Sequence, residues 1–442
     1  MNGAKEAKAL AIVARLRQQG FAAYLAGGCV RDRILGVKAK DFDIATDARP
    51  EVVQNIFPNT IPVGAKFGVV VVVIEDEAFE VATFRADAPY LDGRRPSAVH
   101  FGTLEADAAR RDFTIGGMYY DPAGDRVIDL VGGRRDLRAG IVRAIGNPRE
   151  RFAEDRLRML RAIRFAARLN FTIEPATMDA IRRAAPAIID VSAERIGDEL
   201  VRILTEGNAA RGMELLRQSG LMRALLPEVE GLIGCEQPAN FHPEGDVYRH
   251  TMLALSMLEY GCTETLAFGV LFHDIAKPLT RSEDGEKVTF YGHMERGAEI
   301  ATATLQRLKR SRLVQDRVHY LVRYHLRLTA APKMRPSNLK RMLAEEGFEE
   351  LLSLARIDAL ASNSYLGFYH FCRNAMNAHA PEQLRPPPLI GGNDLIAMGF
   401  TPGPAFKTIL KQVEDLQLDG ELQDRDQAIA YVRGHYAPGS AP

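Results

Sequence analysis

The sequence predicts an α+β chain in which a head with a small mixed sheet is followed by an all-α neck, body and tail. Up to about Val131, runs with strand-like alternation are interspersed with short helical segments. From about Asn147, helical periodicity takes over and continues almost to the end. The chain has 442 residues, which is more than one hydrophobic core usually serves, so several domains are expected.

Composition excludes some classes of protein. The chain is 46% hydrophobic and 26% charged, as in ordinary globular proteins. It has no uncharged apolar run of membrane-spanning length, and its first twenty residues predict an amphipathic helix, not a signal peptide. The four cysteines lack C-x-x-C spacing, so neither a disulfide framework nor a zinc ribbon is indicated. We expect a soluble, cytoplasmic protein with reduced thiols and no membrane partner.

Charge is balanced overall but not locally. The formal net charge is +0, yet residues 131–170 contain eleven arginines against four acidic residues. Clustered arginine is the electrostatic footprint of phosphate binding. The alternative is a solvated helix face whose balancing acids lie elsewhere in the chain.

The elements of the head follow in order. The run FAAYLAGG is a short strand that leads into Gly27 and Gly28, and VRDRILG is a helix that ends at Gly36. The run DFDIAT is a strand with alternating pattern. FGVVVVVIED and AFEVATFRA are two β-rich runs joined by a charged turn, and RVIDLVGG is another strand that ends in glycines.

The glycine pair and the two aspartates form a chemically meaningful pattern. Glycines at a strand end let backbone N–H groups approach phosphate oxygens beside a helix N-terminus. Asp41 and Asp43 lie two apart in DFDIAT, and the strand period of two places both carboxylates on one face. Such carboxylates repel each other unless a divalent cation neutralises them, and Mg²⁺ prefers oxygen ligands. Alone, either feature is as well explained by a tight turn or an exposed strand edge.

Several motifs together resemble a known family. LAGGCVRD followed by DFDIAT resembles the signature of the DNA polymerase β-type nucleotidyltransferase superfamily. RRDFT at 110–114, DLVGGRRDLR at 129–138, EDRLR at 154–158 and SAERIGDEL at 192–200 follow in the order typical of bacterial class II tRNA nucleotidyltransferases and poly(A) polymerases. The resemblance implies a polymerase β-like nucleotidyltransferase head at 1–138, a base-reading helical neck at 139–205, a body at 206–385 and a tail at 386–442.

The resemblance also implies roles for single residues. Asp41 and Asp43 are expected to hold two Mg²⁺ ions, with Glu80 as a third catalytic carboxylate on a neighbouring strand. The residues expected to face the triphosphate and the ribose are Gly27, Gly28, Arg31, Arg110, Arg111 and Asp112. In one departure from the family, Gly116 stands where an Asn is usual, which bears on the ribose contacts.

Base selection without a template is expected from Asp155 and Arg158. At i and i+3 of one helix they would lie side by side. Asp155 would accept from the amino group that C and A share, and Arg158 would donate to the ring acceptor beside it, whereas G and U present the opposite polarity. Glu154 and Arg161 are expected to orient the pair, and Arg164 to add a further nucleotide contact. The alternative is an ordinary helix ion pair.

The segment 83–101 lies between the sheet and RRDFT and is charged, with two prolines. In the family it resembles the flexible loop that helps the pocket change from C to A. Arg85 and Asp87 match the basic-x-acidic element of that loop. This element favours addition of CCA or of the terminal A, because enzymes limited to CC typically lack it.

A second constellation lies on the helical background of about 246–365. His250, the adjacent pair His273 and Asp274, and Asp358 follow the H…HD…D order and resemble the HD-type metal phosphohydrolases. Imidazoles with carboxylates suit a transition metal, Mg²⁺ or Mn²⁺. His293 and His325 are candidate further ligands, which would permit a two-metal site.

The expected function is therefore addition of CCA, or its terminal part, from CTP and ATP to tRNA 3′ ends, with Mg²⁺ in the head. A divalent ion such as Mg²⁺, Mn²⁺ or Ni²⁺ is expected in an accessory HD phosphohydrolase. The expected partner is the tRNA top half, and the expected state is monomer or homodimer. The alternatives are an A-adding or CC-adding enzyme, a poly(A) polymerase, or an HD phosphohydrolase whose degenerate head only binds RNA.

Overall fold

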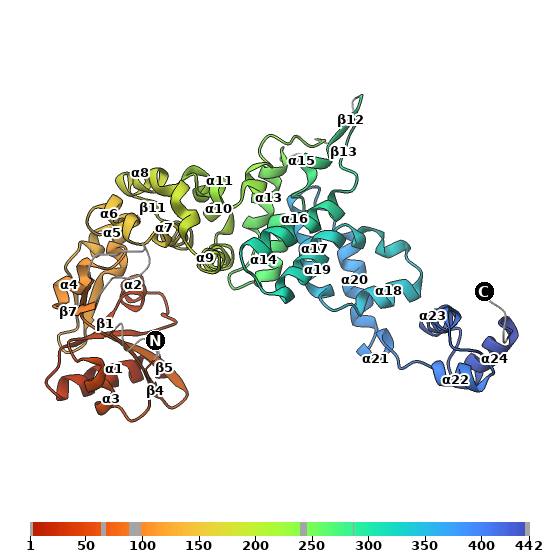
Figure 1. Ribbon diagram of the computed structural model, residues 1–442, viewed down its shortest axis with the longest axis horizontal. Coiled ribbons are helices and arrows are strands. Elements are labelled where there is room, and N and C mark those ends of the chain that lie inside the picture. The colour runs from red at the N-terminus through yellow and green to blue at the C-terminus, as the bar shows by residue number, and fades with distance from the viewer. Residues whose placement is uncertain (1–2, 63–67, 88–98, 239–244, 286, 438–442) are drawn as a thin grey trace. The chain divides into compact units, whose positions relative to one another are not determined.

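The computed structural model describes residues 3–62, 68–87, 99–238, 245–285 and 287–437. The chain divides into two compact units (Figure 1). The first contains residues 1–230 with Leu258–Cys262 and Arg307–Arg310, and the second contains the remainder. The predicted α+β class is confirmed, because a seven-stranded sheet lies in the first unit and helices dominate the second.

The sheet of the first unit is mixed, as expected. Its strand order is β3-β4-β5-β2-β1-β8-β9. The pair β2 and β5 is parallel, with Ile44 opposite Val81, and the pair β1 and β2 is antiparallel, with Leu25 opposite Ile44. The strands are β1 Ala23–Ala26, β2 Asp43–Thr46, β3 Thr60–Ile61, β4 Val69–Ile74, β5 Glu77–Thr83, β8 Met118–Asp121 and β9 Arg126–Asp129.

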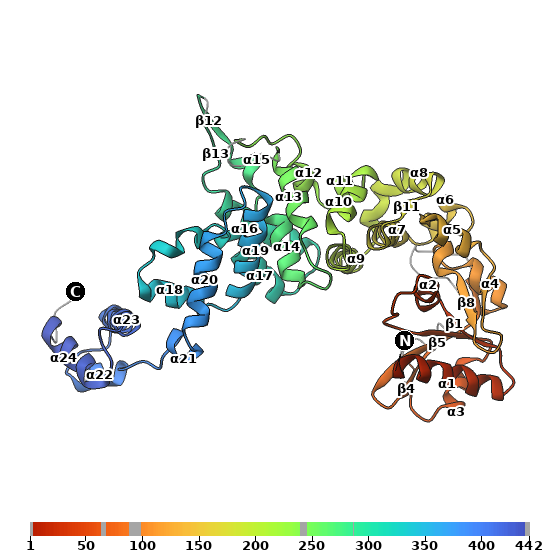
Figure 2. The ribbon, with the colours of Figure 1, turned by 180° about the vertical axis from the view of Figure 1, so that it is seen from behind.

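Helices cover the sheet on both faces. In both ribbon views, α1 (Ala4–Gln18) and α3 (Pro50–Ile56) lie on one side and α2 (Gly28–Ile34) on the other (Figures 1 and 2). Ile12 and Leu16 of α1 are fully buried, which confirms the predicted amphipathic first helix. The remaining elements of this part are β6 Arg85–Asp87, β7 Val99–Phe101, α4 Leu104–Ala109, the 3₁₀ helix Thr114–Gly116, α5 Gly133–Ala139, β10 Ile141–Val142 and β11 Thr172–Ile173.

The rest of the first unit is helical, but the single helix that was expected to carry both Asp155 and Arg158 is two helices. The chain is extended at Asp155, with φ −142° and ψ 105°, and the Asp155 carboxylate accepts a hydrogen bond from the Leu157 amide at 3.1 Å. Aspartate competes for nearby backbone donors in this way and so interrupts helices. The helices are α6 Pro148–Glu154, α7 Leu157–Leu169, α8 Pro175–Ala184, the 3₁₀ helix Ala185–Asp190, α9 Ala193–Thr205, α10 Ala209–Gln218, α11 Leu221–Leu225 and α12 Pro227–Glu230.

The second unit is built around α14 (Glu264–Phe272), which packs against α13, α17 and α19. Phe268 and Phe272 of α14 are fully buried and stack on each other. The predicted helical background is interrupted by a hairpin of β12 (Ser282–Asp284) and β13 (Lys287–Thr289). The other helices are α13 Val247–Ser256, α15 Lys277–Thr280, α16 His293–Arg307, α17 Arg312–Tyr324, the 3₁₀ helix Arg327–Lys333, α18 Pro336–Leu343, α19 Phe348–Ala361, α20 Gly367–Ala378 and α21 Pro381–Leu384.

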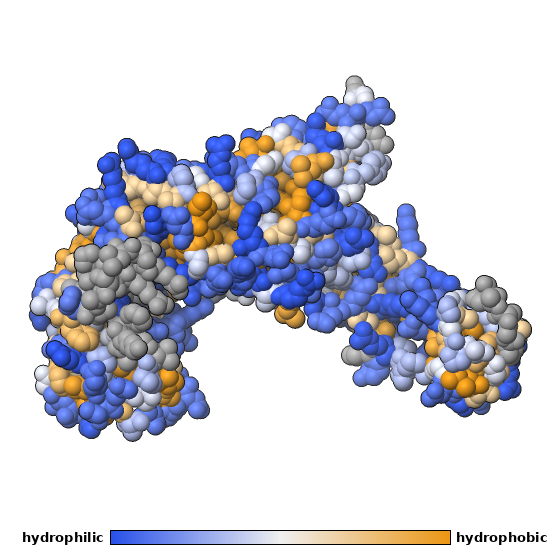
Figure 3. Space-filling view, viewed as in Figure 1, coloured by the Kyte–Doolittle hydropathy of each residue, from blue (hydrophilic) through white to orange (hydrophobic). Residues whose placement is uncertain are grey.

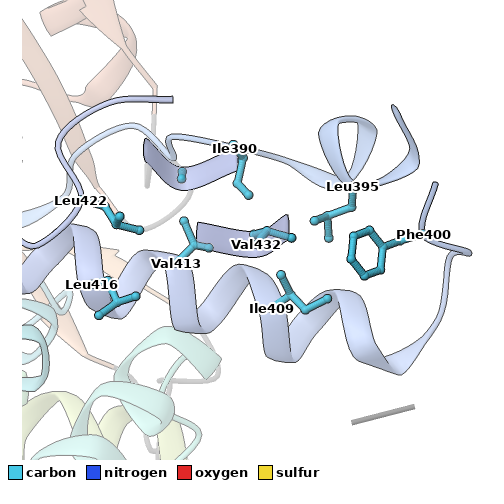
Figure 4. Close-up of a cluster of buried hydrophobic side chains, with 9 residues drawn as sticks. Ile390, Leu395, Phe400, Ile409, Val413, Leu416, Leu422 and Val432 are labelled. Atoms are coloured by element: carbon cyan, nitrogen blue, oxygen red, sulfur yellow. The ribbon is translucent and has the colours of Figure 1, made fainter. Parts of the chain in front are cut away.

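The last helices form a small core of their own. They are α22 (Gly392–Ala397), α23 (Pro404–Asp419) and α24 (Arg425–His435). Figure 4 shows their apolar side chains, with Leu395 and Val432 fully buried in the cluster. Apolar residues also reach the surface of this part on the face shown in Figure 3. Arg341 of α18 pairs with Glu414 of α23 at 2.8 Å and with Asp415, which fixes α23 to α18.

Among the residues that the structure describes, no helix is both long enough and apolar enough to cross a membrane.

Candidate functional site

A cleft with a volume of about 960 Å³ lies in the first unit and brings the predicted carboxylates together. Asp43 is the first residue of β2, opposite Ala26 of β1, and Glu80 lies on the adjacent β5. Strand β2 begins at Asp43, so the expectation that Asp41 lies on the strand is wrong. Asp41, Asp43 and Glu80 nevertheless all line the cleft.

The carboxylates repel one another. Burial against the protein, the negative charge of Glu80 and, to a smaller degree, that of Asp41 raise the pKa of Asp43 to about 6. Solvent still reaches the Asp43 side chain, because the cleft is open at that point. Lys5 pairs with Asp41 at 2.8 Å and offsets part of this charge. A divalent cation would offset the remainder with the oxygen ligands it prefers.

Gly27 allows the backbone to approach the carboxylates closely. Its φ is +72°, a region that side chains disfavour. A Cβ atom there would lie 3.1 Å from Nη1 of Arg111 and 3.7 Å from Oδ2 of Asp43. Gly28 begins α2 and also lines the cleft. The predicted glycine pair therefore lies where a ligand of the acidic cluster would pass.

The arginines expected to meet phosphates are held by buried acids. Arg31, which is 4% exposed, pairs with Asp32 at 2.6 Å. Arg110 and Arg111 pair with opposite oxygens of Asp107 at 2.8 and 3.2 Å. Burial alone would raise the pKa of Asp107, but the guanidinium groups of Arg111 and Arg110 hold it below its ordinary value. Sequence reasoning missed Asp107, although it lies three and four residues before these arginines, the spacing of neighbours on a helix face.

Asp112 also faces arginines. Its Oδ1 accepts from Nε of Arg158 at 2.8 Å, and its Oδ2 lies 2.6 Å from Nη1 of Arg161. Burial opposes ionisation, but Arg161 and Arg158 hold the pKa of Asp112 below its ordinary value. Asp112 is therefore a fixed anion that orients two arginines on the cleft wall.

Asp155 and Arg158 both line the cleft, but they are not neighbours on one helix. Asp155 follows α6 and pairs with Arg195 of α9 at 2.9 Å, whereas Arg158 lies in the first turn of α7 and contacts Asp112 and Glu154. Glu154 contacts Arg158 at 2.6 Å, as expected of an orienting residue.

A further cleft arginine, Arg164 of α7, contacts helix α9. Arg164 is 6% exposed and pairs with Glu199 of α9 at 2.8 Å. Its guanidinium carbon lies over the Phe165 ring, 4.6 Å from the ring centre. Burial lowers the pKa of Arg164, which marks a guanidinium removed from bulk water. Glu199 and Arg195 both come from the motif SAERIGDEL, so the signal for them was present, although no role was assigned.

The expected flexible loop lies mainly outside the described residues. Its ends form the antiparallel pair β6 and β7, with Arg85 opposite Phe101 and Asp87 opposite Val99. Arg85 lines the cleft.

The second constellation converges inside the second unit. Nε2 of His250 lies 3.1 Å from Nε2 of His273 and 3.1 Å from Oδ1 of Asp358. Oδ2 of Asp274 lies 3.3 Å from Nε2 of His273. The ring nitrogens of the other two predicted histidines also face Asp274, with Nε2 of His293 at 3.7 Å and that of His325 at 3.9 Å. Two groups able to hold a metal ion result: His250, His273 and Asp358, and Asp274, His293 and His325.

Backbone carbonyl groups orient three of the imidazole rings. Nδ1 of His273, His293 and His325 lies 2.8, 2.7 and 2.7 Å from the carbonyl oxygen three residues earlier. A proton on each Nδ1 leaves the Nε2 lone pair directed into the cluster, the arrangement that metal-ligating histidines use. Nε2 of His293 is buried and has no hydrogen-bond partner among the described residues, which fits an atom that binds a metal ion.

Burial and a neighbouring charge keep His325 and Asp274 in the forms that bind a metal ion. Burial lowers the pKa of His325 to about 4, so this imidazole is neutral at physiological pH. Burial alone would raise the pKa of Asp274, but Lys277, at 2.6 Å, holds it well below the ordinary value. Deprotonated carboxylates with neutral imidazoles are the donor set that a divalent cation requires.

Comparison with known proteins assigns the segments. Residues 23–143 match the "Poly A polymerase head domain" family, 170–232 match the "Probable RNA and SrmB- binding site of polymerase A", and 247–363 match the "HD domain". A CCA-adding enzyme of Enterococcus faecalis is 33% identical over 431 residues, which cover 96% of this chain and 94% of that protein.

This chain belongs to the CCA-adding enzyme family. Its nucleotidyltransferase resemblance is thereby confirmed. A CCA-adding enzyme of Geobacillus stearothermophilus is 46% identical over 225 residues, and a poly(A) polymerase I of Haemophilus influenzae is 42% identical over 232 residues. These two matches cover 55% and 51% of the relatives, so the chain spans about half the length of each.

Solved structures support the family fold along the whole chain. A Bacillus stearothermophilus CCA-adding enzyme in complex with CTP is similar with a TM-score of 0.74 and 29% identity, covering 97% of this chain and 96% of that one. A Thermotoga maritima CCA-adding enzyme complexed with tRNA has a TM-score of 0.58, covers 97% and 94% of the two chains, and at 20% identity shows the fold alone.

Proposed function

We propose that this chain adds CCA, or its terminal part, to tRNA 3′ ends from CTP and ATP without a template. The observation that carries the proposal is the cleft itself, in which an acidic cluster faces a wall of oriented arginines. The proposal is supported by relatives and similar structures named CCA-adding enzymes, some of them complexed with CTP, ATP or tRNA.

The acidic cluster would hold Mg²⁺. Asp41, Asp43 and Glu80 fit this ion, because they offer oxygen ligands, and burial together with the negative charges of Glu80 and Asp41 raises the pKa of Asp43. When bound, Mg²⁺ would supply activation of the primer hydroxyl and neutralisation of the triphosphate. The protein's own contribution would be to fix these carboxylates on adjacent strands, at a backbone made accessible by Gly27.

The phosphates and ribose would meet the arginines and glycines. Charge-assisted hydrogen bonds from Arg31, Arg110 and Arg111 suit the triphosphate, and their ion pairs with Asp32 and Asp107 hold them in place before it arrives. Asp112 would serve this wall by orienting Arg158 and Arg161. Both oxygens of Asp112 face these arginines, so a ribose hydroxyl would donate to a carboxylate that is already held in place.

Base selection would use Asp155 and Arg158. Cytosine and adenine share an amino donor beside a ring acceptor, which an anion and a cation on the cleft wall would match. Uracil and guanine present the opposite polarity, so they would place an acceptor against Asp155 and a donor against Arg158, which disfavours their binding. Arg195 and Asp112 hold the two groups from different elements. Arg164 would extend this wall beside Phe165.

The test of this function separates it from its alternatives. The pure protein is given tRNA without CCA, tRNA ending in CC, and an unrelated RNA, with each NTP singly and then with CTP and ATP together. CCA addition predicts C, C and A on the first RNA and A on the second. An A-adding or CC-adding enzyme extends only one of them, and a poly(A) polymerase extends the unrelated RNA with many A residues. A degenerate head that only binds RNA predicts no incorporation, and the intact acidic cluster disfavours it.

The HD cluster supports a second function. We propose that His250, His273, Asp274 and Asp358, with His293 and His325, bind divalent metal such as Mg²⁺, Mn²⁺ or Ni²⁺ and hydrolyse phosphoesters such as 2′,3′-cyclic phosphates. The carrying observation is the convergence of oriented Nε2 atoms and ionised carboxylates. When bound, the metal would supply an activated water and charge neutralisation. Calorimetric titration with Mn²⁺ and Ni²⁺, followed by hydrolysis assays, tests this function independently of the head.

A further inference from the structure

A cavity of about 560 Å³ adjoins the HD cluster, and Asp274, His293, His325 and Asp358 form part of its lining. Ligand pockets for molecules of nucleotide size commonly measure about 300–1,000 Å³. The cavity therefore has room for more than the phosphate group on which the cluster would act. The remainder of its lining decides what else the substrate carries.

Two tyrosines of this lining expose most of their surface. Tyr291 is 80% exposed and Tyr365 is 69% exposed, although both line the cavity. An aromatic ring usually buries its faces, and exposed rings beside a polar cluster are typical of binding surfaces. Buried Phe368 lines the same cavity, which makes this lining largely apolar.

Both tyrosines are attached closely to metal-ligand segments. Tyr291 lies between Phe290, whose carbonyl oxygen is 2.7 Å from Nδ1 of His293, and His293 itself. The Tyr365 amide donates to the side chain of Asn363 at 3.0 Å, in the loop after the helix that carries Asp358. Each tyrosine is thus close in sequence to a residue of the HD cluster, Tyr291 to His293 and Tyr365 to Asp358.

The charge of Lys277 favours an anionic group at the other end of the bound molecule. Lys277 lines the cavity, and its ammonium lies 2.6 Å from Asp274 and 5.5 Å from the centre of the Phe290 ring. A cation beside a metal-binding cluster favours an anionic group. An occupant with a phosphoester at one end and a flat ring at the other matches this combination.

We propose that Tyr291 and Tyr365 form a stacking surface for the base of a nucleoside phosphoester bound at the HD site. The proposal rests on the proposed HD hydrolase function and names its substrate class. Aromatic side chains stack on any base, so the surface selects the presence of a base and not its identity. The phosphoester then lies toward the cluster, and the base covers the exposed ring faces.

The experiment compares two substrates that share the reacting group. Adenosine 2′,3′-cyclic phosphate carries a base, and glycerol 1,2-cyclic phosphate does not. Hydrolysis of both by the full chain with Mn²⁺ is measured for the wild type, Tyr291→Ala, Tyr365→Ala, Tyr291→Phe and the control Leu313→Ala. Leu313 is 73% exposed and is not part of the cavity lining. We expect each Tyr→Ala change to raise KM for the adenosine substrate about tenfold, which corresponds to about 1.4 kcal/mol. Tyr291→Phe, Leu313→Ala and all values for the glycerol substrate should stay near wild type.

A second arm measures binding without turnover. Calorimetry gives the Kd of adenosine 2′-phosphate and of glycerol 2-phosphate for the same variants with Mn²⁺. If the wild type hydrolyses both substrates equally well and the tyrosine variants lose nothing, the stacking proposal is overturned and the hydrolase function stands. If neither substrate is hydrolysed but adenosine 2′-phosphate binds more tightly than glycerol 2-phosphate and Tyr291→Ala removes the difference, the hydrolase function fails and the stacking surface stands. Equal binding of the two ligands without hydrolysis overturns both.

Discussion

Nε of Arg158 donates to Oδ1 of Asp112 at 2.8 Å, so the arginine proposed to read the base is held by the aspartate that directly follows Arg110 and Arg111, which are proposed to bind phosphate. The two proposed functions of this wall, holding phosphate and selecting the base, are therefore joined by one ion pair. Neither residue can change without an effect on the other.

Asp112→Asn should weaken both rate and selectivity. The change removes the negative charge that Arg158 and Arg161 share, and each charge-assisted hydrogen bond is worth about 1.5–3 kcal/mol. We expect at least tenfold lower incorporation of C and A, with relatively more UTP and GTP used. Single-nucleotide incorporation with each NTP measures this, and Asp179→Asn, which changes an exposed acid paired with Arg182, is the control. Unchanged selectivity would contradict the coupling.

Asp43→Asn should abolish nucleotide addition while the fold and tRNA binding persist. The change keeps the shape of the side chain but removes a charge from the acidic cluster, and loss of a charge at such a site commonly costs about 10²–10³-fold or more. Asp41→Asn should act in the same way. Incorporation assays and thermal unfolding are measured together, with the exposed Asp47→Asn as control. Near-normal incorporation by the Asp43 variant would remove the metal-binding role.

Asp155→Ala should reduce C and A addition alike, since both bases offer an amino group. Arg195→Ala should have a weaker effect in the same direction, because Arg195 holds the Asp155 carboxylate at 2.9 Å without itself reading the base. Rates for CTP, ATP, UTP and GTP are compared on the same primer. Wild-type rates together with continued exclusion of UTP and GTP would show that Asp155 does not select the base.

Arg85→Ala should lower A addition more than C addition, if the segment from β6 to β7 helps reshape the pocket. Arg85 lines the cleft at the base of this segment. Loss of a charge-assisted contact predicts about tenfold or more for the affected nucleotide. The measurement is the ratio of A incorporation on tRNA ending in CC to C incorporation on tRNA without CCA. An equal decrease in both would leave the segment with general positioning only.

His273→Ala should abolish metal-stimulated phosphoester hydrolysis and leave nucleotide addition unchanged. His273 is fully buried and faces His250 and Asp274, whereas no cleft residue of the head contributes to this cluster. Calorimetric Mn²⁺ titration should show weaker binding in the same variant. Hydrolysis at the wild-type rate would show that the reaction occurs elsewhere.

The fold class predicted from the sequence is confirmed, whereas the roles of the site residues stay predictions. The ordered motifs singled out residues that converge in the structure: Asp43 and Glu80 on adjacent strands, and the residues of the HD cluster on neighbouring helices. The break at Asp155 was not predicted, since its flanking residues keep helical periodicity and only its own side chain, bonded to the Leu157 amide, ends the helix. Asp107 was missed because its spacing before Arg110 and Arg111 is common on helix faces and does not by itself indicate burial.

The break between α6 and α7 has a mutational consequence. In one continuous helix, the spacing of Asp155 and Arg158 would be fixed by helix geometry. Here an ion pair with Arg195 of α9 holds the carboxylate of Asp155, whereas Arg158 belongs to helix α7. The Arg158 amide donates to the Asp155 carbonyl oxygen at 3.1 Å, so the two backbones stay close, and the packing seam between α7 and α9 sets the direction of the Asp155 carboxylate relative to Arg158. Substitutions in this seam, which never touch a nucleotide, give evolution a way to retune nucleotide choice while the cleft lining stays the same.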